Sequence, residues 1–140
     1  MNIKLLPLLL AATTLLGFNA HAATPQEFLK TFAVEAHKEN PAFKEFSASR
    51  GEKMYHAQRA HSGGKQISCA SCHTDNPKNS GAHEKTRKAI EPLAPGANPK
   101  RFTDVAEVEK WFRRNCQDVL ERQCSAQEKG DFLSYLLSVK

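Results

Sequence analysis

The sequence predicts an all-α fold, a single small domain whose helices surround one long irregular loop. Apolar residues recur at helical spacing in four stretches, at about 24–40, 47–60, 104–115 and from 125 onward. The region 61–101 separates the second stretch from the third and contains four prolines. Such a long loop in a small domain is typical of a functional segment or of a segment that wraps a bound group.

The chain begins with a predicted secretory signal peptide, residues 1–22. Lys4 precedes the apolar run 5–18, and Ala20-His21-Ala22 fits a cleavage site with small residues. The run is shorter than the roughly 20 residues of a spanning helix, although an uncleaved anchor is the alternative. Cleavage leaves residues 23–140 as one domain in an oxidising compartment, which in a bacterium is the periplasm.

Charge and composition restrict the possible partners. Without the leader, the formal charge is +4, and no run of five or more Lys or Arg occurs. A nucleic-acid partner is therefore not expected. Because the chain has few large aliphatic residues, we expect a covalent staple or a bound group to complete its core.

The first and fourth helices begin with capping boxes. Thr24 and Glu27 bracket Pro25, which suits a first helical position, and the pair Ser125 and Glu128 has the same spacing. Such pairs satisfy backbone N–H groups that a helix start leaves free. We therefore expect helices to begin at both places.

The second and third helices each carry one residue that needs an explanation. Gly51 lies inside the second, where a glycine is unfavourable unless another helix packs closely. In the third, which Asp104 can cap, the residues at helical spacing along one face are Val108, Trp111, Phe112 and Asn115. Asn115 would stand at the end of this helix, either as a C-cap residue or directed at a partner.

The sequence CASCH at residues 69–73 has the form of a c-type haem attachment motif. Cys69 and Cys72 would form thioethers with the two vinyl groups, and His73 would be the proximal iron ligand. A thioredoxin-like pair would need a preceding strand, a zinc site needs two more nearby ligands, and a Cys69–Cys72 disulfide leaves His73 unexplained. The sequence therefore predicts one covalent haem c.

Two segments resemble the class I cytochrome c fold. GEKMY at residues 51–55 is similar to the glycine-containing stretch of the N-terminal helix in that fold, where the C-terminal helix crosses closely. EPL at residues 91–93 is similar to the segment whose proline carbonyl accepts the N–H of the proximal histidine. The resemblance implies a class I cytochrome c-like helical fold with an extra N-terminal helix, and Pro92 as the partner of His73.

The usual methionine ligand on the other side of the iron is missing. Met1 belongs to the leader, and Met54 precedes the haem motif. The remaining candidates are the loop residue His83, the upstream histidines, an open position, and Asn115. From the residues alone, Asn115 reads more readily as a C-cap or turn residue.

Three segments and one later cysteine resemble the sphaeroides haem protein family of bacterial monohaem cytochromes c. These are IEPLAP at residues 90–95, RFTD at 101–104 and VEKWFRRNC at 108–116, followed by Cys124. The resemblance implies that Asn115 is the sixth iron ligand and that Cys116 and Cys124 form a disulfide. Cys116 and Cys124 are the two thiols that remain once Cys69 and Cys72 bind haem, and an oxidising compartment permits them to form a disulfide. Trp111 and Phe112 could shield the distal side of the haem, or simply pack in the core.

Three functions compete at this point. The family resemblance implies a monomer that exchanges electrons with a dihaem or membrane-bound cytochrome donor and binds O2 or NO when Asn115 leaves. The alternative is a simple electron carrier without gas binding. An enzyme is less expected, beyond a minor O2-reducing activity, because no distal His/Arg pair for peroxide cleavage is evident and Arg114 reads as a surface or propionate contact.

Overall fold

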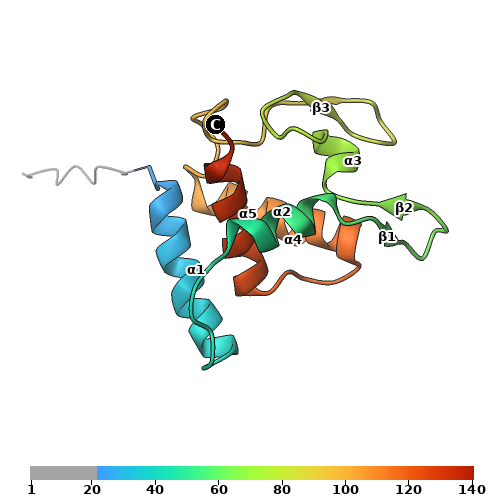
Figure 1. Cartoon of the computed structure of the whole chain (residues 1–140). Helices are drawn as coiled ribbons and strands as arrows, with labels where there is room; N and C mark the ends of the chain where they lie inside the picture. The colour runs from blue at the N-terminus through green and yellow to red at the C-terminus, as the bar shows by residue number, and fades with distance from the viewer. Residues whose placement is uncertain (1–21) are drawn as a thin grey trace, which may run out of the picture.

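The computed structural model describes residues 22–140, so the predicted leader lies outside the described residues except for Ala22. Helices and two small hairpins make up the structure (Figure 1). The helices are α1 Pro25–Glu39, α2 Ala48–His56, α3 Ala70–His73, α4 Val105–Leu120 and α5 Ala126–Ser138. The strands are β1 Arg59–Ala60, β2 Gln66–Ile67, β3 Gly81–Ala82 and β4 Ala89–Ile90. The all-α prediction is confirmed, with an N-terminal helix ahead of the rest.

Side-chain caps set the starts of the long helices. Thr24 and Glu27 form the capping box of α1, and Ser125 and Glu128 form that of α5. Asp104 caps α4, since its carboxylate accepts the N–H of Glu107 at 2.8 Å. Each cap satisfies a backbone donor that the helix start leaves without an intrahelical partner.

Helix α4 is longer than the sequence predicted. It continues past Asn115 to Leu120 and ends at Glu121, whose backbone is left-handed with φ 54°. The prediction that Asn115 closes this helix is wrong, because residues 116–120 contain no glycine or proline to stop it. Asn115 is exposed in the interior of α4, whereas Val108 and Phe112 on the same stripe are buried.

Helices α2 and α5 cross at Gly51. A Cβ at this position would overlap the backbone carbonyl of Asp131, so only glycine permits the approach. The buried Asp131 carboxylate accepts the backbone N–H of Ser47 at 2.6 Å and Nε–H of Arg50 at 2.7 Å. An acid of α5 therefore helps to cap the start of α2 and fixes the two helices together.

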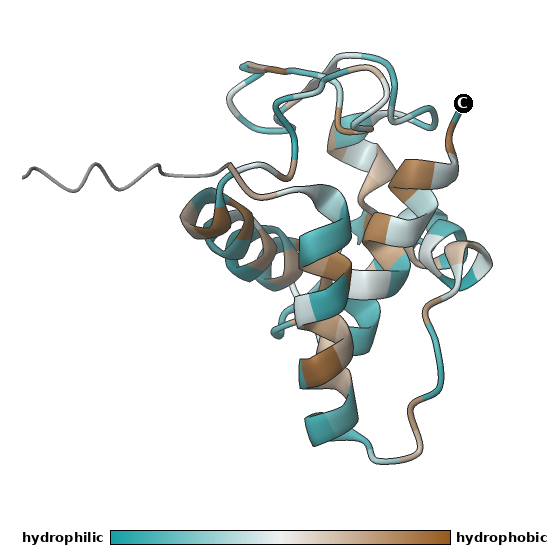
Figure 2. Cartoon of the chain, turned by 90° about the vertical axis from the view of Figure 1, so that its left-hand side faces the viewer, coloured by the Kyte–Doolittle hydropathy of each residue, from teal (hydrophilic) through white to brown (hydrophobic). Residues whose placement is uncertain are grey.

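Aromatic rings form the centre of the core. The ring of Phe112 on α4 lies 5.7 Å from that of Phe32 on α1 and 5.8 Å from that of Phe132 on α5. Figure 2 shows that hydrophobic residues lie mostly on the helices, while the connecting segments are mostly hydrophilic. Helix α1 thus covers a core shared by α4 and α5, and α4 is held at its middle.

The predicted long loop contains local structure of its own. Strand β1 pairs with β2 and β3 with β4, both antiparallel, and α3 lies between the two hairpins. Helix α2 ends at His56, before the predicted residue 60, and residues 83–88 form the turn of the β3–β4 hairpin. Among the described residues, no helix is both long and apolar enough to span a membrane.

Candidate haem site

The CASCH segment forms one tight helical turn. Cys69 is the N-cap of α3, and its carbonyl accepts the backbone N–H of Cys72 at 3.3 Å and of His73 at 3.1 Å. Both thiols are free and partly buried. Two reduced thiols and an imidazole therefore come from a single turn, which is the donor set that a covalently attached haem requires.

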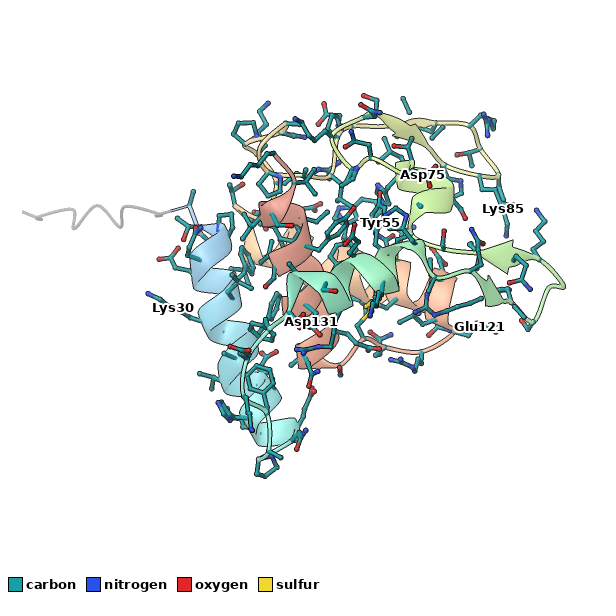
Figure 3. All side chains as sticks on the ribbon, in the orientation of Figure 1. Lys30, Tyr55, Asp75, Lys85, Glu121 and Asp131 are labelled. Atoms are coloured by element: carbon teal, nitrogen blue, oxygen red, sulfur yellow. A yellow bond between two sulfur atoms is a disulfide. The ribbon has the colours of Figure 1, made fainter. Side chains whose placement is uncertain are left out.

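Contacts from two elements, α2 and β3, hold this turn in place. The hydroxyl of Tyr55 on α2, which is fully buried, donates to the carbonyls of His73 at 3.1 Å and Thr74 at 2.7 Å. Gly81 of β3 packs so closely on the backbone of Cys72 that a Cβ would overlap the Cys72 carbonyl. Figure 3 shows Tyr55 on α2 below the turn. The backbone beside His73 is thus fixed by neighbours distant in sequence.

Burial sets the protonation of the turn. It lowers the pKa of His73 to about 4, with a smaller contribution from the positive charge of Arg101. It also raises the pKa of the Cys69 thiol to about 11. His73 is therefore neutral near pH 7 and can offer a nitrogen lone pair, while Cys69 is a thiol rather than a reactive thiolate.

The carbonyl of Pro92 has donors that the sequence did not suggest. Arg101 Nε–H donates to it at 2.9 Å, Asn98 donates weakly at 3.4 Å, and a second Arg101 nitrogen bonds the carbonyl of Glu91 at 2.8 Å. Acceptance of the His73 N–H by Pro92 stays a prediction. No role at this site was predicted from the sequence for Arg101, whose guanidinium is half-buried beside the haem turn.

Trp111 and Phe112, the two predicted pocket residues of α4, face different surroundings. Phe112 lies in the aromatic core, so its contact with haem stays a prediction. Trp111 is 43% exposed, its indole N–H donates to Glu107 at 2.9 Å, and Arg114 lies 5.3 Å from its ring centre. Asn115 follows Trp111 by four residues and is also exposed, so these two residues share one open face of α4.

The rival histidines have local partners. Nδ1 of His83 accepts the backbone N–H of Thr86 at 3.2 Å inside the β3–β4 turn, and the residue is exposed. Nε2 of His61 lies 3.5 Å from Glu121, and His56 lies 3.9 Å from Asp75. Within residues 22–140, no group of three or more His, Cys, Asp or Glu side chains is arranged to hold a metal ion. These histidines serve as turn or surface residues in the structure.

Cys116 and Cys124, which the family resemblance pairs, are joined by a disulfide in the structure. Their Cα atoms are 5.6 Å apart, and both residues are buried. The bond begins one residue after Asn115 and closes the loop that leads into α5. The C-terminal part of α4 is thereby attached covalently to the start of α5.

Known proteins resemble this chain over most of its length. The family described as a domain of unknown function (DUF1924) matches residues 41–136. Cytochrome c'' of Methylophilus methylotrophus is 39% identical over 125 residues, which are 86% of this chain and 87% of that protein. Cytochrome c-type protein SHP of Cereibacter sphaeroides is 44% identical over 91 residues, or 64% of this chain and 68% of that protein.

Solved structures of these relatives resemble the fold of this chain. The crystal structure of oxidized cytochrome c'' gives a TM-score of 0.77 at 39% identity, covering 83% of this chain and 94% of that one. A solution structure of cytochrome c'' is described as giving insights into haem-ligand detachment. It has a TM-score of 0.73 at 39% identity, and the match covers 81% of this chain and 92% of that one. The structure of oxidized SHP, described as an oxygen binding cytochrome c, has a TM-score of 0.72 at 34% identity. The match covers 82% of this chain and 96% of that one.

Proposed function

Since this chain belongs to the family of monohaem c-type cytochromes that includes cytochrome c'' and SHP, we propose that it is a periplasmic haem protein with a displaceable iron ligand. Its haem c is covalent and single, as in those relatives. We assign the iron ligands to His73 and Asn115, and we assign O2 or NO as the molecule that replaces Asn115. Electrons would come from a dihaem or membrane-bound cytochrome.

The proximal half of the proposal rests on the α3 turn. Cys69 and Cys72 would attach the porphyrin, and the neutral His73 would bind its iron. The bound haem would supply an iron that changes oxidation state and can hold a diatomic gas. Tyr55 and Gly81 fix the backbone of the turn, and with it the point from which the imidazole extends.

The distal half rests on Asn115. No methionine follows the haem motif, and Met54 lies on α2 before it. An amide oxygen is a hard, weak ligand, suited to ferric iron and easily displaced from ferrous iron. The observation that carries the proposal is the position of Asn115, on the open face of α4 with Trp111 and immediately before the disulfide.

The relatives support the choice of a displaceable ligand over a permanent one. SHP is described as an oxygen binding cytochrome c, and the solution structure of cytochrome c'' as bearing on haem-ligand detachment. The predicted leader and these relatives also favour the periplasm as the location.

Spectra of the haem-loaded protein test the proposal. We expect a low-spin ferric form, and a high-spin ferrous form that binds CO and NO. Asn115→Ala should make the ferric form high-spin. Asn115→His supplies a stronger ligand, so its ferrous form should stay low-spin and bind CO more slowly, by about tenfold or more.

His83→Ala is the control, because His83 is the rival ligand and an exposed turn residue. It should leave every spectrum unchanged. If the wild-type ferrous protein stays low-spin and refuses CO, gas binding is excluded and the protein is a simple electron carrier. If Asn115→Ala keeps wild-type ligation while His83→Ala loses it, the distal ligand is His83.

A further inference from the structure

The loop of the β1–β2 hairpin contacts the C-terminal end of α4 through one carboxylate. Glu121 accepts the backbone N–H of Ser62 at 3.1 Å and also the Ser62 hydroxyl. Its carboxylate lies 3.5 Å from Nε2 of His61. Figure 3 shows Glu121 at the end of α4 beside this hairpin. Three polar contacts thus join two elements about 60 residues apart in sequence.

The hairpin end that meets Glu121 is held by hydrogen bonds of its own. The backbone N–H of His61 donates to Lys65 at 2.8 Å, and that of Gly64, with φ 79°, donates to His61 at 2.8 Å. Nδ1 of His61 accepts the N–H of Gly63 at 3.2 Å, so a neutral ring carries its proton on Nε2, the nitrogen facing Glu121. Glu121 therefore contacts a hairpin loop whose conformation is set by its own hydrogen bonds.

Glu121 is in turn tied to the helix that it ends. It is the C-cap residue of α4, and its N–H donates to the carbonyl of Gln117 at 3.1 Å. It also lies within the loop closed by the Cys116–Cys124 disulfide. A displacement of Glu121 would therefore be transmitted to the helical turn that contains Asn115.

The other end of the hairpin leads directly to the haem turn. Strand β2 ends at Ile67, and the buried Ser68 connects it to Cys69. The N–H of Ser68 donates to the Ser71 hydroxyl at 3.0 Å, which fixes this entry. The haem-bearing segment with His73 is therefore connected through the β1–β2 hairpin to Glu121, and through Glu121 to the helix that carries Asn115.

We infer that Glu121 is a positioning residue for the distal iron ligand, an inference that rests on the proposed function. It holds the end of α4 at a fixed place relative to the haem-bearing segment. A weak amide ligand stays bound only while its carrier is held in place, so loosening this contact shifts the population toward the open, gas-accepting iron. Glu121 acts through Asn115 and does not itself contact the iron.

The test compares variants of the haem-loaded protein. In Glu121→Ala we expect a larger high-spin fraction in the ferric form and CO association to the ferrous form faster by about three- to tenfold. Ser62→Ala should act in the same direction. Glu121→Gln keeps an oxygen that accepts from Ser62, so it should lie between Glu121→Ala and wild type.

The matched control is Glu109→Gln on the same helix. It removes an ion pair of 2.7 Å to Lys129 without touching the hairpin, and its CO kinetics should equal those of wild type. A similar acceleration in this control would show general loosening of α4 and overturn the inference. Melting curves of each variant establish that it is folded at the temperature of measurement.

A double mutant separates the two proposals. Once Asn115→Ala has removed the ligand, adding Glu121→Ala should have no further effect on CO association. If Asn115→Ala changes ligation and Glu121→Ala alone does not, the positioning role fails and the proposed function stands. If Asn115→Ala leaves ligation unchanged, both fail.

Discussion

Tyr55 shows how one buried side chain supports the haem turn. Its hydroxyl donates to two carbonyls, those of His73 and Thr74, and burial raises its pKa well above the ordinary value. The hydroxyl therefore remains a donor at every physiological pH. The ring that carries this hydroxyl is fully buried.

Tyr55→Phe should lower the free energy of unfolding by about 1–3 kcal/mol, because two part-buried carbonyls lose their donor. Urea denaturation of the haem-loaded protein measures this loss. Tyr135→Phe is the control, since within residues 22–140 the Tyr135 hydroxyl makes one long contact, 3.4 Å to His56. Equal losses in the two variants would contradict a special role for Tyr55.

The sequence could identify the residues whose chemistry is contiguous, and not those whose role depends on folding. The contiguous spacing of Cys69, Cys72 and His73 is the one that predicts covalent attachment of a porphyrin. No role near His73 was predicted for Arg101, because the carbonyls that turn it inward belong to residues 9 and 10 positions earlier in the loop. Its inward orientation follows from tertiary packing, which no local pattern encodes.

At the level of elements, the crossing of α2 and α5 depends on one missing side chain. A Cβ at Gly51 would overlap the Asp131 carbonyl and touch Tyr135, and backbone cannot move aside as a flexible side chain can. The resemblance to the class I fold predicted this contact, and the structure confirms it.

Gly51→Ala should destabilise the fold by about 1–3 kcal/mol, the usual cost of overpacking. Thermal unfolding followed by far-UV circular dichroism measures this change. Gly63→Ala is the matched control, because a Cβ there would meet only the His61 ring, at an ordinary 3.6 Å. If both variants melt at the wild-type temperature, the crossing is looser than the structure indicates.

The helix starts and the end of α1 were predicted well, whereas the ends of α2 and α4 and the hairpins were not. A capping box is a local signal, so Thr24 and Ser125 marked their helices correctly. The end of α4 has no such signal, because Glu121 adopts its left-handed conformation without being glycine. The strands contain two residues each, too few for an alternating pattern to be visible in the sequence.

For the whole molecule, carboxylates that are paired in the folded state make stability depend on pH. Hydrogen bonds from Arg122 lower the pKa of Glu128, a Ser62 hydrogen bond lowers that of Glu121, and Lys65 lowers that of Glu84. Their folded pKa values lie below the ordinary 4.5, so the unfolded chain takes up protons first as the pH falls. Their stabilisation is complete above that value and is lost below it.

The melting temperature of the haem-loaded protein should therefore be nearly constant from pH 7 to about 5 and should fall below about 4.5. Glu128→Gln should flatten the fall, because Glu128 is the most buried of the three. Circular dichroism follows the melting, and the Soret band shows that haem ligation is intact before heating. A melting temperature unchanged down to pH 3 would contradict this account.

The attachments of α4 determine what kind of motion can open the proposed gas site. Phe112 is enclosed by the rings of α1 and α5, the disulfide ties the end of the helix, and Glu121 binds the hairpin. Retreat of the whole helix would separate Phe112 from its ring neighbours and Glu121 from the hairpin, and would pull against the disulfide, whereas rotation of the Asn115 side chain disturbs none of the three attachments. In the proposed mechanism, exchange of the iron ligand is thus a change in two torsion angles of one asparagine. The molecule can then turn over its ligand on the timescale of side-chain rotation while its backbone stays still.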